Sequence, residues 1–300
     1  MAYHSVVLVK QVPDTANITG QAMKEDGTIN RAALPAVFNP EDLNALEMAL
    51  QVKEAHGGQV TVLTMGPPRA ADVLRQALYR GADRVILLTD RKTAGSDTLA
   101  TSYVLKCAVE AIGTHLAAWD LVFCGRQAID GDTAQVGPQV AEKLGLPQIT
   151  YAEEILALRN GEIVARRALP LGTETVQCAL PCLLTVVGSA NVPRPPNVRR
   201  MMAYKLAATP FDYPELLERW PEFETEEALD RYLAERDQRI LVWNAADVGA
   251  DYGRVGLAGS PTKVLKVDFV SLGASDNREV EDSPQELAEM VRELVQDYIL

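Results

Sequence analysis

Residues 124–138, CGRQAIDGDTAQVGP, have the residue types in this sequence that best suit ligand binding. The segment follows the apolar run WDLVF and precedes the helix-like run QVAEKLG, so we expect a turn from a strand into a helix. Gly125, Gly131 and Gly137 let backbone N–H groups approach a ligand, and a helix N-terminus favours phosphate. This pattern favours a phosphate cradle.

The polar side chains of the same segment offer further contacts. Thr133 and Gln135 can add hydroxyl and amide hydrogen bonds, while Asp130 and Asp132 can hold ribose hydroxyls, cap turns or order the loop. Arg126 is its only basic residue, so neutral donors would make most phosphate contacts. A capped, glycine-rich connection without a ligand is the alternative. Neither GxGxxG nor a Walker motif is present, so the spacing does not identify a nucleotide.

Strand and helix patterns alternate along the first half of the chain. Apolar runs predict strands over residues 5–11, 59–66, 84–90 and 119–125. Start and stop signals predict helices over residues 39–56, 68–82 and 95–116, and from the end of the loop to about residue 144. This order predicts an α/β fold with a parallel sheet and helices on both faces. Ligands of such sheets sit beyond the carboxyl ends of the strands.

The helix over residues 39–56 has a strong start signal. Asn39 can cap it and Pro40 fits its first turn. Glu41 and Asp42 favour the positive end of the helix dipole. These residues therefore fix where the helix begins.

The second half of the chain changes in pattern. Alternating residues and an Asn-Gly turn predict antiparallel strands over residues 151–188. Residues 189–200 predict a loop, because proline and the residue before it resist helix and strand. Residues 24–31 carry an Asp-Gly hairpin signal. Residues 204–240 are acidic and helical in parts, and residues 207–240 resemble an insertion.

The C-terminal part predicts a helical extension. Residues 256–267 form a small-residue loop that runs into a short strand. Ser283, Pro284 and Glu286 then form a capping box with proline at the first helical position. The apolar stripe of this helix can pack on its own domain or on a partner.

Composition excludes several classes of partner. The net charge of −12 argues against a nucleic-acid partner, and no apolar run reaches the roughly 20 residues needed to span a bilayer. The N-terminus lacks a basic flank and a cleavage site, so we expect a cytoplasmic or matrix-like location.

The four cysteines lie in apolar runs and predict buried thiols, and the scattered histidines predict no metal site.

Several motifs resemble one family in order along the chain. GRQAIDGDTAQVGP closely resembles the signature loop of the β subunit of electron transfer flavoproteins. VLVKQVPDT, NPEDLNALEMAL, TMGPP, RGADRVILLTD, LPCLLTV and NVPRPPN resemble its other segments, over roughly residues 5–205, and GLAGSPTKV matches again near the end. The resemblance implies a Rossmann-like fold of the adenine-nucleotide-binding type, paired with an α subunit that carries a movable FAD.

The resemblance also implies a division of the chain and a set of site residues. Residues 1–205 would form the nucleotide-binding domain with its antiparallel extension, and residues 206–300 an acidic insertion and a C-terminal arm contacting the α subunit. Carried over by matching position, the cofactor-binding residues are Leu8, Asn39, Pro40, Glu41, Asp42, Met65, Gly125, Arg126, Gln127, Ala128, Ile129, Asp130, Gly131, Asp132, Thr133, Ala134, Gln135 and Val136. No side chain is assigned as a catalytic acid or base.

The cofactor has two candidates. Conventional members hold AMP in this subunit, and bifurcating members hold a second FAD. VKQVPDT, DGDTAQVGP and GLAGSPTKV look more like the bifurcating members. That implies that electrons pass from NADH to two acceptors. One acceptor is the α-subunit FAD, which serves an acyl-CoA dehydrogenase or quinone-linked partner, and the other is a low-potential carrier such as ferredoxin or flavodoxin. A hydrolase or regulatory ATP binder of similar fold is a third alternative, but the general base or metal cluster that it needs is not evident.

The proline-rich segment over residues 191–200 matches the loop where the dehydrogenase partner docks in this family. Val198 would be the apolar anchor, and Arg194, Arg199 and Arg200 would meet acidic residues of the partner. The alternative is a rigid connector with solvated arginines. The family loop has a more acidic start than this sequence, which leaves the identity of the partner open.

Overall fold

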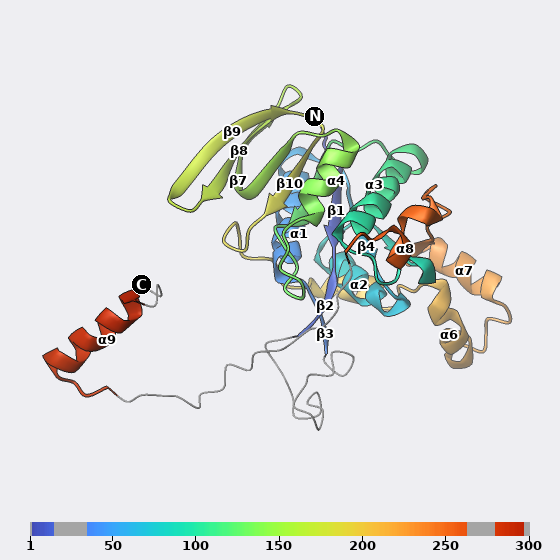
Figure 1. Cartoon of the computed structure of the whole chain (residues 1–300). Helices are drawn as coiled ribbons and strands as arrows, with labels where there is room; N and C mark the ends of the chain where they lie inside the picture. Colours follow the sequence, from blue (N-terminus) through green and yellow to red (C-terminus); the bar gives the residue numbers. More distant parts are fainter. Residues whose placement is uncertain (1, 15–34, 263–279, 297–300) are drawn as a thin grey trace.

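A mixed nine-stranded sheet organises the chain (Figure 1). The computed structural model describes residues 2–14, 35–262 and 280–296. In sheet order the strands are β11 (Leu241–Trp243), β5 (Arg84–Leu88), β4 (Val60–Met65), β1 (Ser5–Val9), β6 (Leu121–Gly125), β10 (Cys182–Val186), β7 (Gln148–Arg159), β8 (Glu162–Leu169) and β9 (Gly172–Ala179). The predicted α/β fold with a mostly parallel sheet is confirmed.

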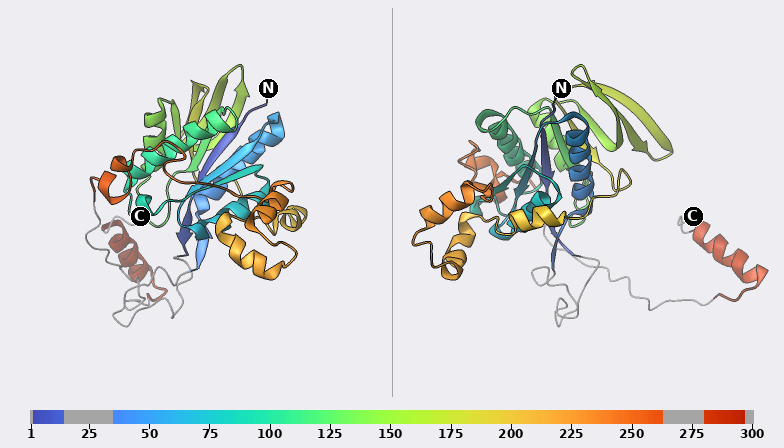
Figure 2. Two further views of the ribbon diagram at one scale, coloured as in Figure 1. Left: turned by 90° about the vertical axis from the view of Figure 1, so that its right-hand side faces the viewer. Right: turned by 180° about the vertical axis from the view of Figure 1, so that it is seen from behind.

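The sheet is parallel from β11 to β7 and antiparallel from β7 to β9. The prediction of antiparallel strands throughout residues 151–188 is wrong for β10, which lies between β6 and β7 and pairs parallel with both. Every residue of β10 is buried, as expected for a parallel strand covered on both faces. The three antiparallel strands project from one end of the sheet (Figure 2).

Helices cover both faces of the parallel strands. They are α1 (Pro40–His56), α2 (Ala71–Arg80), α3 (Thr98–His115) and α4 (Val136–Leu144). Residues of α1 and α2 belong to one buried apolar cluster, and residues of α3 and α4 to the other. The four predicted helices are confirmed, with shifts of a few residues at their ends.

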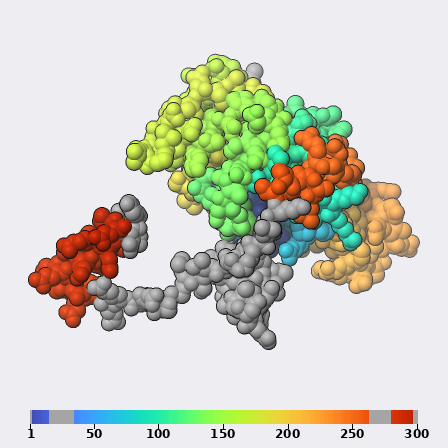
Figure 3. All heavy atoms as spheres, in the orientation of Figure 1, coloured from blue at the N-terminus to red at the C-terminus, as the bar shows by residue number. Residues whose placement is uncertain are grey.

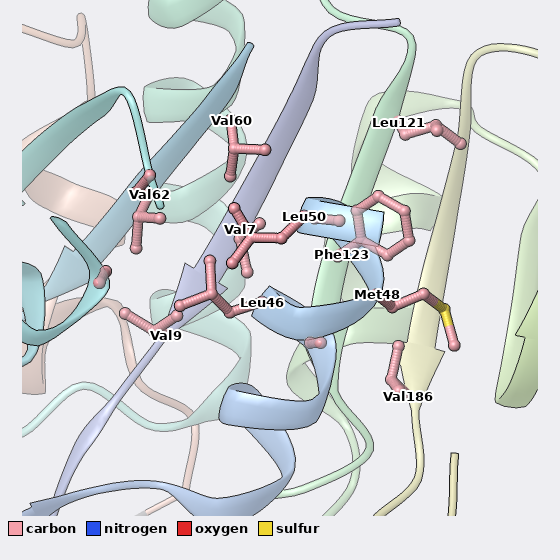
Figure 4. Packing of buried hydrophobic residues seen from close by; sticks show 14 of the residues in the cluster. Val7, Val9, Leu46, Met48, Leu50, Val60, Val62, Leu121, Phe123 and Val186 are labelled. Carbon is pink, nitrogen blue, oxygen red and sulfur yellow. The ribbon is translucent and has the colours of Figure 1, made fainter. Parts of the chain in front are cut away.

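The packing of α1 on the sheet shows what holds this layer (Figure 4). Its side chains Leu46 and Leu50 lie against Val7 of β1 and Phe123 of β6, and all four are 2% exposed or less. Full burial of such a side chain contributes about 1.5–3 kcal/mol. This layer fixes the start of α1 beside the carboxyl ends of β1 and β6.

The described residues form seven further strands and α-helices. They are β2 (Gln11–Pro13), β3 (Ala36–Phe38), α5 (Val198–Tyr204), α6 (Tyr213–Arg219), α7 (Glu226–Ala234), α8 (Gly256–Gly259) and α9 (Pro284–Gln296). Helices α6 and α7 share a small apolar cluster that includes Tyr213 and Leu229. Strand β11 lies beyond residue 205, so the sheet includes part of the segment that we assigned to a second domain.

Some predictions can be compared only in part. The Asp-Gly hairpin over residues 24–31 and the strand after residue 262 lie outside the described residues. Cys107, Cys124 and Cys182 are buried as expected, whereas Cys178 is partly exposed. Over the described ranges, no helix has the length and apolar character needed to cross a membrane, and no three potential metal ligands lie together.

Candidate functional site

The predicted site residues gather where β1, β4 and β6 end. The loop over residues 126–135 leaves β6 and faces the N-terminus of α1. Leu8 is buried on β1, and Met65, the last residue of β4, packs partly buried on the same apolar cluster. Pro40 is exposed in the first turn of α1, and Val136 begins α4. Residues far apart in the sequence therefore meet at one edge of the sheet.

Asn39 holds the loop and does not cap its own helix. It occupies the N-cap position of α1, but its side chain makes no capping hydrogen bond there. Its Nδ2 donates to the Gln127 carbonyl at 2.9 Å, and its Oδ1 accepts from the Ile129 N–H at 3.1 Å. The expected capping role is wrong, because both polar atoms of the side chain serve a segment about 90 residues away.

Glu41 and Arg126 form a second link between α1 and the loop. Arg126 Nη2 lies 3.0 Å from Glu41 Oε1, and the Gln127 N–H donates to Glu41 Oε2 at 2.9 Å. The side-chain hydrogen bonds of Glu41 raise the pKa of Arg126, so the guanidinium stays charged. Its charge is already neutralised within the protein and is not free for a phosphate.

The side chain of Asp42 joins the carboxyl ends of β1 and β6. Its Oδ2 accepts the Lys10 N–H at 2.8 Å, and its Oδ1 accepts the Gly125 N–H at 2.9 Å. The residue is only 6% exposed. Asp42 therefore positions the residues around the site from a buried place and is not itself open to a ligand.

Ion pairs and hydrogen bonds also hold the outer part of the loop. Lys10 Nζ contacts both carboxylate oxygens of Asp130, at 2.7 and 2.8 Å. Gln127 Nε2 donates to Asp132 Oδ1 at 2.9 Å, which bends the loop onto itself. Gln135 Oε1 accepts from the Thr98 hydroxyl at the start of α3. Among the described residues that hold this loop, Lys10 and Arg126 are cations, and each is paired with a carboxylate.

The three glycines of the loop have different roles. A Cβ at Gly125 would lie 2.5 Å from Asp42 Oδ1, and a Cβ at Gly137 would lie 2.7 Å from Cys124 Sγ. At Gly131 no described atom lies within 4 Å of that position. Close packing within the protein explains Gly125 and Gly137, so only Gly131 has the open surroundings that a cradle requires.

We expect Gly125→Ala to destabilise the protein by about 1–3 kcal/mol, because Asp42 and the α1 backbone cannot move away without losing their hydrogen bonds. Gly131→Ala is expected to change stability by less than about 0.5 kcal/mol. Urea unfolding of both variants measures the difference. Equal effects at the two positions would contradict this account of the packing.

The middle of the loop presents unused backbone donors. Within the described residues, the N–H groups of Thr133 and Ala134 have no hydrogen-bond acceptor. Asp132 and Ala134 have positive φ angles of 50° and 52°, a conformation that costs energy in residues other than glycine. These donors immediately precede the N-terminus of α4, which favours an anion. The arrangement can therefore hold a phosphate through neutral groups.

A C-terminal segment that is not among the predicted site residues also reaches this edge. The Ser260 hydroxyl accepts the Asp97 N–H at 2.8 Å, and the Thr262 hydroxyl donates to Asp97 Oδ2 at 2.7 Å. The Ser96 hydroxyl accepts the Gly256 N–H at 2.9 Å. Figure 3 shows the segment around α8, in orange, against the teal segment leading into α3. The contacts join residues about 160 apart, so no local sequence signal could reveal them.

Burial raises the pKa of Asp42 from 3.8 to about 7, and its hydrogen bonds offset this only in part. Between these values the folded chain keeps a proton that the unfolded chain releases, so the contribution of Asp42 to stability falls as the pH rises through this window. The predicted loss has an upper limit of about 4 kcal/mol. Urea unfolding at about pH 5 and about pH 8 should show a smaller decrease in Asp42→Asn than in the parent. An identical decrease would contradict the assignment.

The docking residues predicted in the proline-rich loop differ in availability. Val198 is 74% exposed at the start of α5, and Arg199 is exposed beside it. Arg194 instead contacts Glu47 and Glu54 of α1, with its Nε 2.8 Å from Glu47 Oε2. Its guanidinium is thus engaged within the chain, which leaves Val198 and Arg199 as the exposed members of the set.

A mostly parallel sheet with helices on both faces and a small-sided loop before a helix at its carboxyl edge defines an open α/β protein, a class that binds its ligands at that edge. Residues 26–210 match the model of the electron transfer flavoprotein domain. A FixA protein of Sinorhizobium fredii is 44% identical over 267 residues, covering 88% of this chain and 82% of that protein.

Two β subunits give similar matches. The electron transfer flavoprotein subunit beta of Clostridium acetobutylicum is 41% identical over 261 residues, covering 87% of this chain and 86% of that protein. The one of Megasphaera elsdenii is 42% identical over 265 residues, with the same coverage. The chain belongs to the electron transfer flavoprotein family, which confirms the resemblance seen in its motifs.

Proposed function

We propose that this chain is the β subunit of an electron transfer flavoprotein heterodimer and binds FAD at the edge formed by α1, the loop over residues 126–135 and α4. The observation that carries the proposal is the pair of unused N–H donors at Thr133 and Ala134, next to the α4 N-terminus. When bound, the flavin would supply the redox chemistry, taking electrons from NADH and passing them to two acceptors. The acceptors are the α-subunit FAD, which serves an acyl-CoA dehydrogenase or quinone-linked partner, and a low-potential carrier such as ferredoxin or flavodoxin.

The residues of the chain would bind and orient the nucleotide. Main-chain N–H groups of Thr133 and Ala134 would hold phosphate oxygens, and Asp132 would accept from ribose hydroxyls. Asn39, Glu41 and Asp42 would keep the loop in place through the hydrogen bonds that they make to it. The exposed Val198 and Arg199 would contact the dehydrogenase, and residues 206–300 would contribute contacts to the α subunit.

A second candidate is the conventional arrangement, with AMP here and all redox chemistry in the α subunit. Lys10 pairs with Asp130, and Arg126 pairs with Glu41. Neither of these two cations is then free to neutralise the pyrophosphate of FAD, which favours AMP. The motif likeness to bifurcating members favours FAD.

The nucleotide content of the purified heterodimer tests the proposal. We expect denaturation to release two FAD per heterodimer, whereas one FAD and one AMP would establish the second candidate. In the double variant Gly131→Val and Asp132→Ala we expect most of the β-subunit nucleotide to be lost. No described atom lies within 4 Å of a Cβ at position 131, so a loss of nucleotide with normal folding would report a change at the ligand site, through position 131 or the Asp132 carboxylate. Unchanged occupancy with normal folding would show that the nucleotide lies elsewhere.

A further inference from the structure

A cavity of about 700 Å³ lies between the end of α1, the end of α2 and the segment over residues 194–200. Lys53 lies in the last turn of α1, and Gly81 follows α2 and precedes β5. Helices of this sheet run back towards the amino ends of the strands, so the cavity lies away from the edge where the nucleotide is proposed to bind. It is therefore a separate feature of the molecule.

Five of the six charged residues that line the cavity are cations. Its charged lining residues are Lys53, Glu54, Arg80, Arg194, Arg199 and Arg200. Two of the cations are neutralised within the protein: Lys53 pairs with Asp83, and Arg194 pairs with Glu47 and Glu54. The other three are arginines with no carboxylate partner in the part of the chain that the structure describes. The protein as a whole carries a net charge of −12, so this local positive charge is unlike the rest of the molecule.

Arg80 is the arginine of the three that has a buried side-chain donor without a partner among the described residues. Its Nη1 donates to the Gln76 carbonyl at 3.0 Å, but its Nε is buried and has no hydrogen-bond partner among the described residues. Burial also lowers the pKa of Arg80, which reflects loss of water around the charge. A charge removed from water without an opposite charge is unfavourable, and an anion in the cavity would relieve this cost.

A purely structural role accounts for only part of the cluster. Arg200 donates to the carbonyls of Leu78 and Ala82, and cations are favourable at the negative end of a helix such as α2. The carbonyl contact of Arg80 has the same explanation. The buried Nε of Arg80 and the exposed, unpaired Arg199 do not.

We propose that, when no dehydrogenase is docked on Val198 and Arg199, this cavity binds a small organic phosphate, a phosphate ester that carries two negative charges and an apolar portion. The planar guanidinium groups of Arg80 and Arg199 suit the oxygens of a phosphate, to which such a group can donate two hydrogen bonds. The unpaired arginines also carry more positive charge than one carboxylate would neutralise. Leu50, Pro195 and Val198 provide apolar wall for the remainder of the ligand. The volume lies in the range of small-molecule sites.

Titration calorimetry of the nucleotide-loaded heterodimer with phenyl phosphate tests the site. Phenyl phosphate should bind saturably and more tightly than inorganic phosphate, which lacks an apolar portion, or benzoate, which has one charge. Arg80→Gln and Arg199→Gln should each weaken binding about tenfold or more, because each removes a charged donor. Arg219→Gln makes the same change in net charge at an exposed helix position outside the cavity and should leave binding unchanged.

Three results would overturn the proposal. The first is that phenyl phosphate does not bind saturably, and the second is that it binds Arg80→Gln as tightly as the control Arg219→Gln. The third is that the bound nucleotide is released as phenyl phosphate binds, because phenyl phosphate would then occupy the nucleotide site. Arg199 is exposed, so its variant gives an answer even if Arg80→Gln folds poorly. Binding of a short polyglutamate peptide at this site, with none of phenyl phosphate, would assign the cavity to an acidic protein segment instead.

Discussion

Replacing Arg194 by alanine is expected to lower the free energy of unfolding by about 3–5 kcal/mol. Glu47, whose side chain is 7% exposed, accepts the Arg194 backbone N–H at 3.1 Å and its Nη2 at 3.0 Å in addition to Nε. Burial alone would raise the pKa of Glu47, but the hydrogen bonds from Arg194 outweigh it and hold that pKa below its ordinary value. Removing the guanidinium would leave a buried carboxylate without its counter-charge. Urea unfolding measures the loss.

Two control variants separate this effect from a loss of surface charge. Glu54→Gln removes a carboxylate that is 61% exposed and should cost no more than about 1 kcal/mol. Arg199→Ala removes a neighbouring exposed arginine and should change stability by less than about 0.5 kcal/mol. If Arg194→Ala kept full stability but slowed electron transfer from the dehydrogenase, Arg194 would be a docking residue, as the family resemblance implies.

Replacing Asp42 by alanine is expected to cost about 2–5 kcal/mol in stability and to empty the proposed nucleotide site. The substitution leaves the buried N–H of Gly125 and the partly buried N–H of Lys10 without an acceptor, at up to about 1–3 kcal/mol each. Gly125 begins the loop that carries Thr133 and Ala134, so its displacement would move the proposed phosphate donors. Urea unfolding and the nucleotide released on denaturation measure the two effects.

Asp42→Asn and Asp72→Ala are the matched comparisons. The asparagine keeps one acceptor oxygen and should lose about half as much stability as the alanine. Asp72 is 60% exposed in the first turn of α2 and pairs with Arg75, so its replacement should cost no more than about 1 kcal/mol. A small effect of Asp42→Ala, similar to that of Asp72→Ala, would show that the two strand ends do not depend on this carboxylate.

Local signals predicted the elements that build the sheet edge. The start of α1 follows from Pro40 and the acidic residues after it, because a fixed φ and the helix dipole act within one turn of chain. The C-terminal helix begins where its serine and proline predict, and the Ser283 hydroxyl accepts the Glu286 N–H at 3.3 Å. The turn between β6 and α4 follows from its glycine and small polar residues. Propensity, capping and apolar periodicity depend on neighbours in sequence, so the sequence alone determines them.

Tertiary structure decided which partner each side chain has. Asn39 resembles a helix cap but bonds a loop across the site, and Arg194 resembles a docking residue but neutralises Glu47. The glycine at position 125 resembles part of a phosphate cradle but makes room for Asp42. The direction of β10 was likewise decided by tertiary structure, because it depends on pairing with β6 and β7. Hydrogen bonds, charge pairing and close packing act over a few ångströms in space, and only the folded chain shows which distant residues come within that range.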